Sequence, residues 1–125
     1  MKAETVIYFT EKEEEFANLL TEIGITRKMA KVLVFLVNMP EATTHMIEAG
    51  TDMRQPEVSF AMGLLKKRGW ITSSEYKNEY KTRPAKIYKL AKPITEILDS
   101  IKEEVEIKAN NELESIKKLQ NYLKN

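Results

Sequence analysis

Four polar side chains with distinct hydrogen-bonding chemistry lie within six residues near the middle of the chain. The guanidinium of Arg54 offers paired donors that match guanine, and the amide of Gln55 offers a donor and an acceptor that match adenine. Ser59 could bind a base or a phosphate. Glu57 could accept from the amino group of cytosine, or it could only stabilise the positive end of a helix. If the segment begins a helix that enters the major groove, these side chains could reach the edges of base pairs.

Cationic side chains follow these residues along the chain. The lysines among these cationic residues are expected to bind phosphates. Arg83 precedes a proline that stiffens the chain, so it is the candidate for a minor groove. An alternative applies to the first two lysines, because cations favour the C-terminal end of any helix. The predicted phosphate-binding lysines are Lys66, Lys67, Lys77, Lys81 and Lys86.

Positive charge is concentrated in one third of the chain, although the net charge is only +1. Residues 51–92 carry ten basic and four acidic side chains. Residues 1–50 carry five basic and eight acidic side chains, and residues 93–125 carry five and seven. The local excess indicates an anionic partner for the middle segment.

Two short helices must position the base-reading residues. Pro56 fits the first position of a helix over about 55–68, although Gln55 and Pro56 could serve only as helix-start residues. Val58, Ala61, Met62 and Leu65 recur at helical spacing and predict its buried face. Before it, a helix is expected to open at Thr43 or Thr44 and to stop at Gly50. Two helices joined by a short turn are typical of a helix-turn-helix.

The flanking segments complete the predicted domain. Thr10 and Glu13 have capping-box spacing for a first helix, and residues 27–39 form a helix that is apolar nearly all round. Residues 70–72 and 85–90 have strand composition. A basic segment, residues 74–86, lies between them and overlaps the start of the second strand. The expected fold is therefore mainly α, an α+β winged helix-turn-helix over residues 1–92.

Residues 93–125 predict one long helix with a narrow apolar stripe. An isolated helix could not bury this stripe, so we expect it to pair with a second copy of the chain as a homodimer. Parallel and antiparallel pairing both fit at this stage. The predicted dimerisation residues are Leu98, Ile101, Val105, Ala109, Leu113, Ile116, Leu119 and Leu123.

The stretch RQPEVSFAMGLLKKRGWI resembles the recognition helix of archaeal and bacterial winged-helix transcription regulators of the ArsR, MarR and TrmB kind. TRPAKIYKL (residues 82–90) is similar to the element that closes the wing in these families. The resemblance covers about residues 10–92 and implies a DNA-binding fold. Phe60 and Gly63 depart from the pattern, because basic or polar residues often occupy these positions. The matching residues of the helix are Gln55, Pro56, Val58, Ser59, Leu65 and Gly69.

Other classes of protein are disfavoured. The chain has no cysteine, which excludes disulfides and fits a cytoplasmic protein. It has no apolar run long enough for a membrane span. No nucleophile–base pair or phosphate-binding loop suggests an enzyme or a cofactor. His45 and Glu48 lack a third metal ligand nearby.

Three functions therefore compete. The first is a homodimeric, sequence-specific regulator that binds double-stranded DNA in the cytoplasm. The second is a chromatin-associated protein that binds DNA without sequence preference. The third is a protein-interaction module, which would suit an exposed Phe60 and Leu64. These sequence patterns do not identify the operator, the regulated genes, the direction of regulation or any effector.

Overall fold

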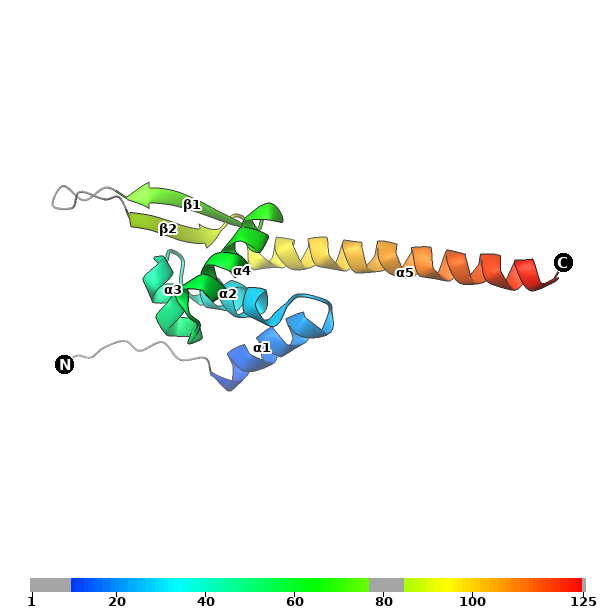
Figure 1. The fold of residues 1–125 in the computed structure, drawn as a ribbon, viewed down its shortest axis with the longest axis horizontal. Coiled ribbons are helices and arrows are strands. Elements are labelled where there is room, and N and C mark those ends of the chain that lie inside the picture. The colour runs from blue at the N-terminus through cyan, green and yellow to red at the C-terminus, as the bar shows by residue number, and fades with distance from the viewer. Residues whose placement is uncertain (1–9, 77–84, 125) are drawn as a thin grey trace. The chain divides into compact units, whose positions relative to one another are not determined.

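The computed structural model describes residues 10–76 and 85–124, which form two compact units divided between Lys92 and Pro93. Its elements confirm the predicted winged helix followed by a long helix (Figure 1). In chain order they are α1 (Glu11–Glu22), α2 (Arg27–Asn38), α3 (Thr44–Thr51), α4 (Gln55–Lys67), β1 (Ile71–Tyr76), β2 (Ala85–Leu90) and α5 (Ile94–Lys124).

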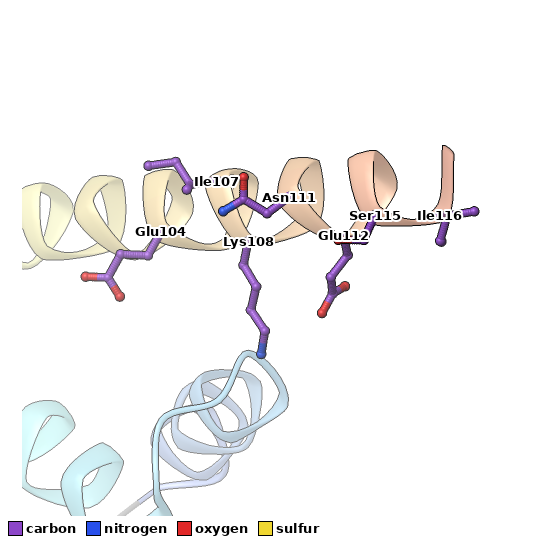
Figure 2. A pocket seen from close by; sticks show the side chains of 7 residues that line it. All are labelled: Glu104, Ile107, Lys108, Asn111, Glu112, Ser115 and Ile116. Atoms are coloured by element: carbon purple, nitrogen blue, oxygen red, sulfur yellow. The ribbon is translucent and has the colours of Figure 1, made fainter. Parts of the chain in front are cut away.

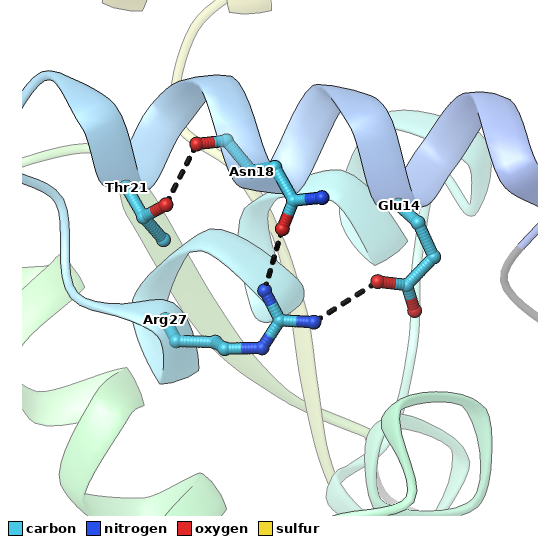
Figure 3. Close-up of polar contacts among 4 residues, drawn as sticks. All are labelled: Glu14, Asn18, Thr21 and Arg27. Atoms are coloured by element: carbon cyan, nitrogen blue, oxygen red, sulfur yellow. Dashed lines mark hydrogen bonds and ion pairs between the residues drawn. The ribbon is translucent and has the colours of Figure 1, made fainter.

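The predicted capping box begins α1. The backbone N–H of Glu13 donates to the Thr10 hydroxyl (3.2 Å), and the Glu13 carboxylate accepts from the Thr10 backbone N–H (2.7 Å). Arg27, at the start of α2, donates to Asn18 (2.7 Å) and pairs with Glu14 (3.0 Å), as Figure 3 shows. These contacts fix the α1–α2 corner through polar side chains at the surface.

The core of the first unit is built around α2. Seven of its twelve residues are buried, as expected for a helix that is apolar nearly all round. It packs against α1, α3 and α4 and also contacts β2. The buried residues are Met29, Ala30, Val32, Leu33, Val34, Phe35 and Leu36.

The end of α3 differs from the prediction. Gly50 does not stop the helix, which continues to Thr51 and ends at Asp52 in the left-handed conformation (φ 57°). Gly50 is instead required by packing, because a Cβ there would lie 2.6 Å from Cδ1 of buried Phe35 and closer still to its Cε1. A tertiary contact thus explains a glycine that resembles a helix stop.

The two strands form an antiparallel hairpin in which Ile71 pairs with Leu90 and Glu75 with Lys86. β1 begins one residue later and ends four residues later than predicted. The extension arises because residues 73–76, which are mostly polar, pair with residues of β2. The backbone of Ala42, before α3, pairs with Tyr88 through two hydrogen bonds (2.8 and 3.0 Å). Main-chain pairing therefore joins the helix-turn-helix to the hairpin.

α5 is uninterrupted over Ile94–Lys124, as expected from its lack of glycine and proline. Ile97 and Ile101 are buried, and every residue from Lys102 to Lys124 is exposed. Among the described parts of the chain, no helix has the length and apolar character needed to span a membrane.

Candidate nucleic-acid interface

The start of α4 brings the predicted base-reading residues together. Arg54 is the N-cap and has an extended backbone conformation, and Gln55 is the first helical residue. Pro56 is the second helical residue, one position later than predicted. Proline costs nothing there, because the first turn of a helix lacks acceptors for its N–H groups. Arg54, Gln55 and Pro56 are all exposed.

Gln55 and Ser59 are joined to each other. The Gln55 amide donates to the Ser59 hydroxyl (3.0 Å) across one turn of α4. This bond holds the amide against the helix surface and leaves its oxygen as an acceptor. The i, i+4 spacing in the sequence allows this pairing.

Glu57 is engaged within the protein. One carboxylate oxygen accepts from the Arg54 backbone N–H (2.9 Å), and the other pairs with Lys28 of α2 (3.5 Å). The hydrogen bond from Arg54 lowers the pKa of Glu57 below its ordinary value of 4.5, and Lys28 lowers this pKa further. Two roles were considered for Glu57, and its contacts with Arg54 and Lys28 support stabilisation of the helix start.

α4 separates its buried and exposed faces cleanly. The predicted core residues Val58, Ala61, Met62 and Leu65 are all buried. The opposite face carries an aromatic ring, since Phe60 is 66% exposed. Gly63 is also exposed, and a Cβ there would meet no atom within 4 Å. The remaining exposed residues of this face are Gln55, Pro56, Ser59, Lys66 and Lys67.

The C-terminal end of α4 connects to the hairpin. Lys66 donates to the Ser73 hydroxyl of β1 (3.1 Å), and the guanidinium of Arg68 lies 4.1 Å from the ring centre of buried Trp70. Lys67 is exposed beside them. The helix ends near residue 68, as predicted, and Gly69 just past its end takes a positive φ of 74°. Two of the cations thus have structural contacts in addition to favouring this helix end.

The hairpin contributes a further exposed cation from the predicted set, Lys86, which lies opposite Glu75. Lys89 of β2 is also exposed, and the sequence analysis did not assign it a role. A signal for it was present in the charge excess of residues 51–92. Lys77, Lys81 and Arg83 lie outside the described residues.

The residues predicted for dimerisation differ in exposure. Ile101 is buried and Leu98 is half-buried, whereas Val105, Ala109, Leu113, Ile116, Leu119 and Leu123 are exposed. An open hollow lies along α5 (Figure 2), and the seven residues that line it all belong to this helix. Glu104, Lys108 and Glu112 extend to one side of the helix there.

Solved structures with similar folds are winged-helix proteins. TrmBL2, an archaeal chromatin protein, superposes with a TM-score of 0.69 at 18% identity over 90% of this chain. A possible transcriptional regulator from Methanosarcina mazei Go1 has a TM-score of 0.65 at 16% identity, covering 86% of both chains. A MarR family transcription regulator has a TM-score of 0.53 at 20% identity, over 90% of this chain and 78% of the other.

These comparisons show a shared fold. The chain spans 40% of the length of TrmBL2. No protein-family model matches the chain, and no curated protein matches it in sequence. The proteins with similar structures include transcription regulators and a chromatin protein that binds DNA. ArsR-like membership and an archaeal source stay predictions.

Proposed function

We propose that this chain is a homodimeric, sequence-specific DNA-binding transcription regulator. α4 lies in the major groove, and the basic segment over residues 74–86 contacts the flanking backbone and minor groove. A homodimer binds two half-sites about one helical turn apart. The protein acts in the cytoplasm, without a catalytic step or a cofactor.

The observation that carries this proposal is the composition of the exposed face of α4. Gln55 and Ser59, held together by a 3.0 Å hydrogen bond, occupy its N-terminal end, where helices of this fold reach base edges. Lys67 is exposed at the other end, within the most basic third of the chain. These side chains are of the types that read base edges at a helix start and bind phosphates at a helix end.

Phe60 adds an apolar contact to the same face. Aromatic and methyl-bearing side chains contact the C5 methyl group of thymine in the major groove. Because no side chain projects from Gly63, the helix backbone can approach the DNA closely at this point. Base recognition therefore combines the polar residues at the helix start with Phe60 in its middle.

Fluorescence anisotropy of a labelled duplex over a salt series tests the proposal. The logarithm of the binding constant should fall by about 0.9 for each phosphate contact per decade of salt. Lys67→Glu should weaken binding to every sequence and reduce this slope by about one. Lys12→Glu, the same charge change at an exposed lysine of α1, is the matched control and should leave the slope unchanged. Absence of binding to any duplex at low salt would refute the proposal.

Variants of Gln55 and Arg54 test sequence specificity. Replacing either with alanine should reduce discrimination between preferred and competitor duplexes by about 1–3 kcal/mol, and should affect the salt slope less than Lys67→Glu does. Equal losses on all sequences would remove their assigned role. Charge reversal at Lys81 or Arg83 tests the basic segment in the same assay, and should weaken binding to all sequences.

A chromatin-associated role is the second candidate function, favoured by the fold similarity to TrmBL2. Its distinguishing result is a footprint that spreads along DNA without preferred sites. A protein-interaction module is the third, favoured by the exposure of Phe60. It predicts no duplex binding at low salt, together with recovery of a partner protein that the Phe60→Ala variant no longer retains.

A further inference from the structure

The two ends of α5 carry opposite charge. Residues 94–114 have seven acidic and two basic side chains, whereas residues 115–124 have three lysines and no acidic side chain. A helix with this distribution attracts a second copy that runs in the opposite direction. A second copy running in the same direction would place the acidic ends side by side and the lysines side by side.

Four charged residues lie in one row along α5 with symmetric spacing. Asp99 and Glu106 are 7 residues apart, Glu106 and Lys117 are 11 apart, and Lys117 and Lys124 are 7 apart. Steps of 7 and 11 residues return to the same side of an α-helix within about 20°. All four residues are exposed. The row therefore has two acids at one end and two bases at the other, at mirrored positions.

The exposed apolar stripe beside this row has nearly the same centre. Val105 and Leu119 lie equally far from residue 112, and Ala109 and Ile116 are symmetric to within one residue. Leu113 lies next to the centre, and all five residues are exposed. Reversing the helix therefore superposes apolar positions on apolar positions and acids on bases.

We propose that α5 pairs antiparallel with α5 of a second copy, centred near residue 112. This inference rests on the homodimer of the proposed function and specifies its interface. A two-fold axis that reverses the helix direction brings the same flank of both copies together. Glu106 then faces the partner's Lys117, and Asp99 faces the partner's Lys124, each pair occurring twice. Val105 packs against the partner's Leu119.

Disulfide crosslinking distinguishes the two directions, since the natural chain has no cysteine. Val105→Cys is mixed with a size-tagged Leu119→Cys chain under mild oxidation. Antiparallel pairing places these residues opposite each other, within the roughly 4.4–6.8 Å between Cα atoms that a disulfide requires. The mixture should form the mixed dimer, and each variant alone should not crosslink.

A cysteine at Ile107 is the matched control. It is exposed but lies about 200° around the helix from Val105, so it should not crosslink to Leu119→Cys. Efficient crosslinking of Val105→Cys or Leu119→Cys with itself would indicate parallel pairing and overturn the proposal. Absence of crosslinks in every sample, with helicity retained in circular dichroism, would also overturn it.

Charge exchange provides an independent test by analytical ultracentrifugation. Lys117→Glu converts two attractive pairs into repulsive ones and should raise the dimer Kd about tenfold. The double variant Glu106→Lys/Lys117→Glu restores both pairs and should return the Kd to within about twofold. An unchanged Kd in the single variant, or no recovery in the double variant, would overturn the proposal.

Anisotropy on the same samples separates this inference from the proposed function. Salt-dependent DNA binding by a chain that crosslinks in parallel would overturn the antiparallel interface alone. Salt-dependent DNA binding by a monomer would overturn the interface and the homodimer of the proposed function, and would support its DNA-binding activity. A dimer with the predicted crosslinks that binds no duplex would support the interface and refute the DNA-binding function.

Discussion

Replacing Gly50 or Gly63 with alanine should change stability in opposite directions, although both glycines lie within helices. In an open helical position, alanine is more favourable than glycine by about 0.5–1 kcal/mol. Gly63 is such a position, because an added Cβ meets nothing within 4 Å. Gly63→Ala should therefore raise the free energy of unfolding by that amount.

At Gly50 the added Cβ overlaps the ring of Phe35, which is 2% exposed and cannot move into solvent. Overpacking of a core costs about 1–3 kcal/mol. Overlap with several ring atoms places this variant near the upper value, and the gain in helix propensity offsets about 1 kcal/mol of it. The expected net loss is about 2 kcal/mol.

Urea denaturation followed by fluorescence of the single Trp70 measures both effects. With a slope of about 2 kcal/mol per molar urea, Gly50→Ala should lower the midpoint by about 1 M and Gly63→Ala should raise it by about 0.25–0.5 M. All samples need the same protein concentration, because dimerisation would itself shift the midpoint. Phe35→Leu should reduce the penalty of Gly50→Ala by relieving the overlap. Similar gains for both glycine variants would refute the Gly50–Phe35 contact.

Three further variants test other contacts. Thr43→Ala should cost about 1 kcal/mol in urea denaturation, because the Thr43 side chain caps α3, whereas Thr44→Ala inside the helix should cost less; equal losses would contradict the cap. Glu57→Gln should lower the urea midpoint at pH 7. The lowered pKa of Glu57 means that its contribution is present above the unfolded-state pKa and lost as the pH falls through the folded-state value, so the difference should shrink as the pH falls below 4.5 and close once the pH lies below the folded-state pKa. A difference that persists there would contradict this assignment. Phe60→Ala should change the free energy of unfolding by less than about 0.5 kcal/mol, since Phe60 is 66% exposed. The same variant should lose any preference for thymine over uracil in a duplex, and a preference retained in anisotropy would argue against the thymine contact.

Local sequence patterns predicted the parts of the fold that depend on local interactions. The spacing of Thr10 and Glu13 indicated the start of α1, and the spacing of Val58, Ala61 and Leu65 indicated the buried face of α4. These features involve residues three or four positions apart, so the sequence contains both partners within one short segment.

Features that depend on distant residues were not predictable in this way. Gly50 was interpreted as a helix stop from its local position. Its actual role depends on contact with Phe35 in another helix, which no local pattern indicates. The ion pair between Lys28 and Glu57 joins α2 to α4, and spacing alone does not indicate it. The polar residues of β1 have weak strand propensity, and pairing with β2 extends the strand beyond the predicted end.

In the candidate site too, local positions could be read from the sequence, whereas contacts between distant residues could not. The exposure of Gln55 and Ser59 agrees with their helical position opposite the core face. Their i, i+4 spacing allows the hydrogen bond between them, which the sequence analysis did not predict. The contact of Lys66 with Ser73 depends on how the chain turns after Gly69, which the sequence indicated only as the end of the helix.

The pairing of Ala42 with Tyr88 has a consequence for how this surface can change in evolution. Both hydrogen bonds use backbone atoms, so they persist when the side chains of the hairpin are replaced. Substitutions in β1 and β2 can therefore redistribute charge while the hairpin keeps its attachment to the segment before α3. Proline at either paired position is the exception, because it removes the donor. The scaffold thereby allows descendants of this chain to acquire new surface chemistry without having to evolve a new fold.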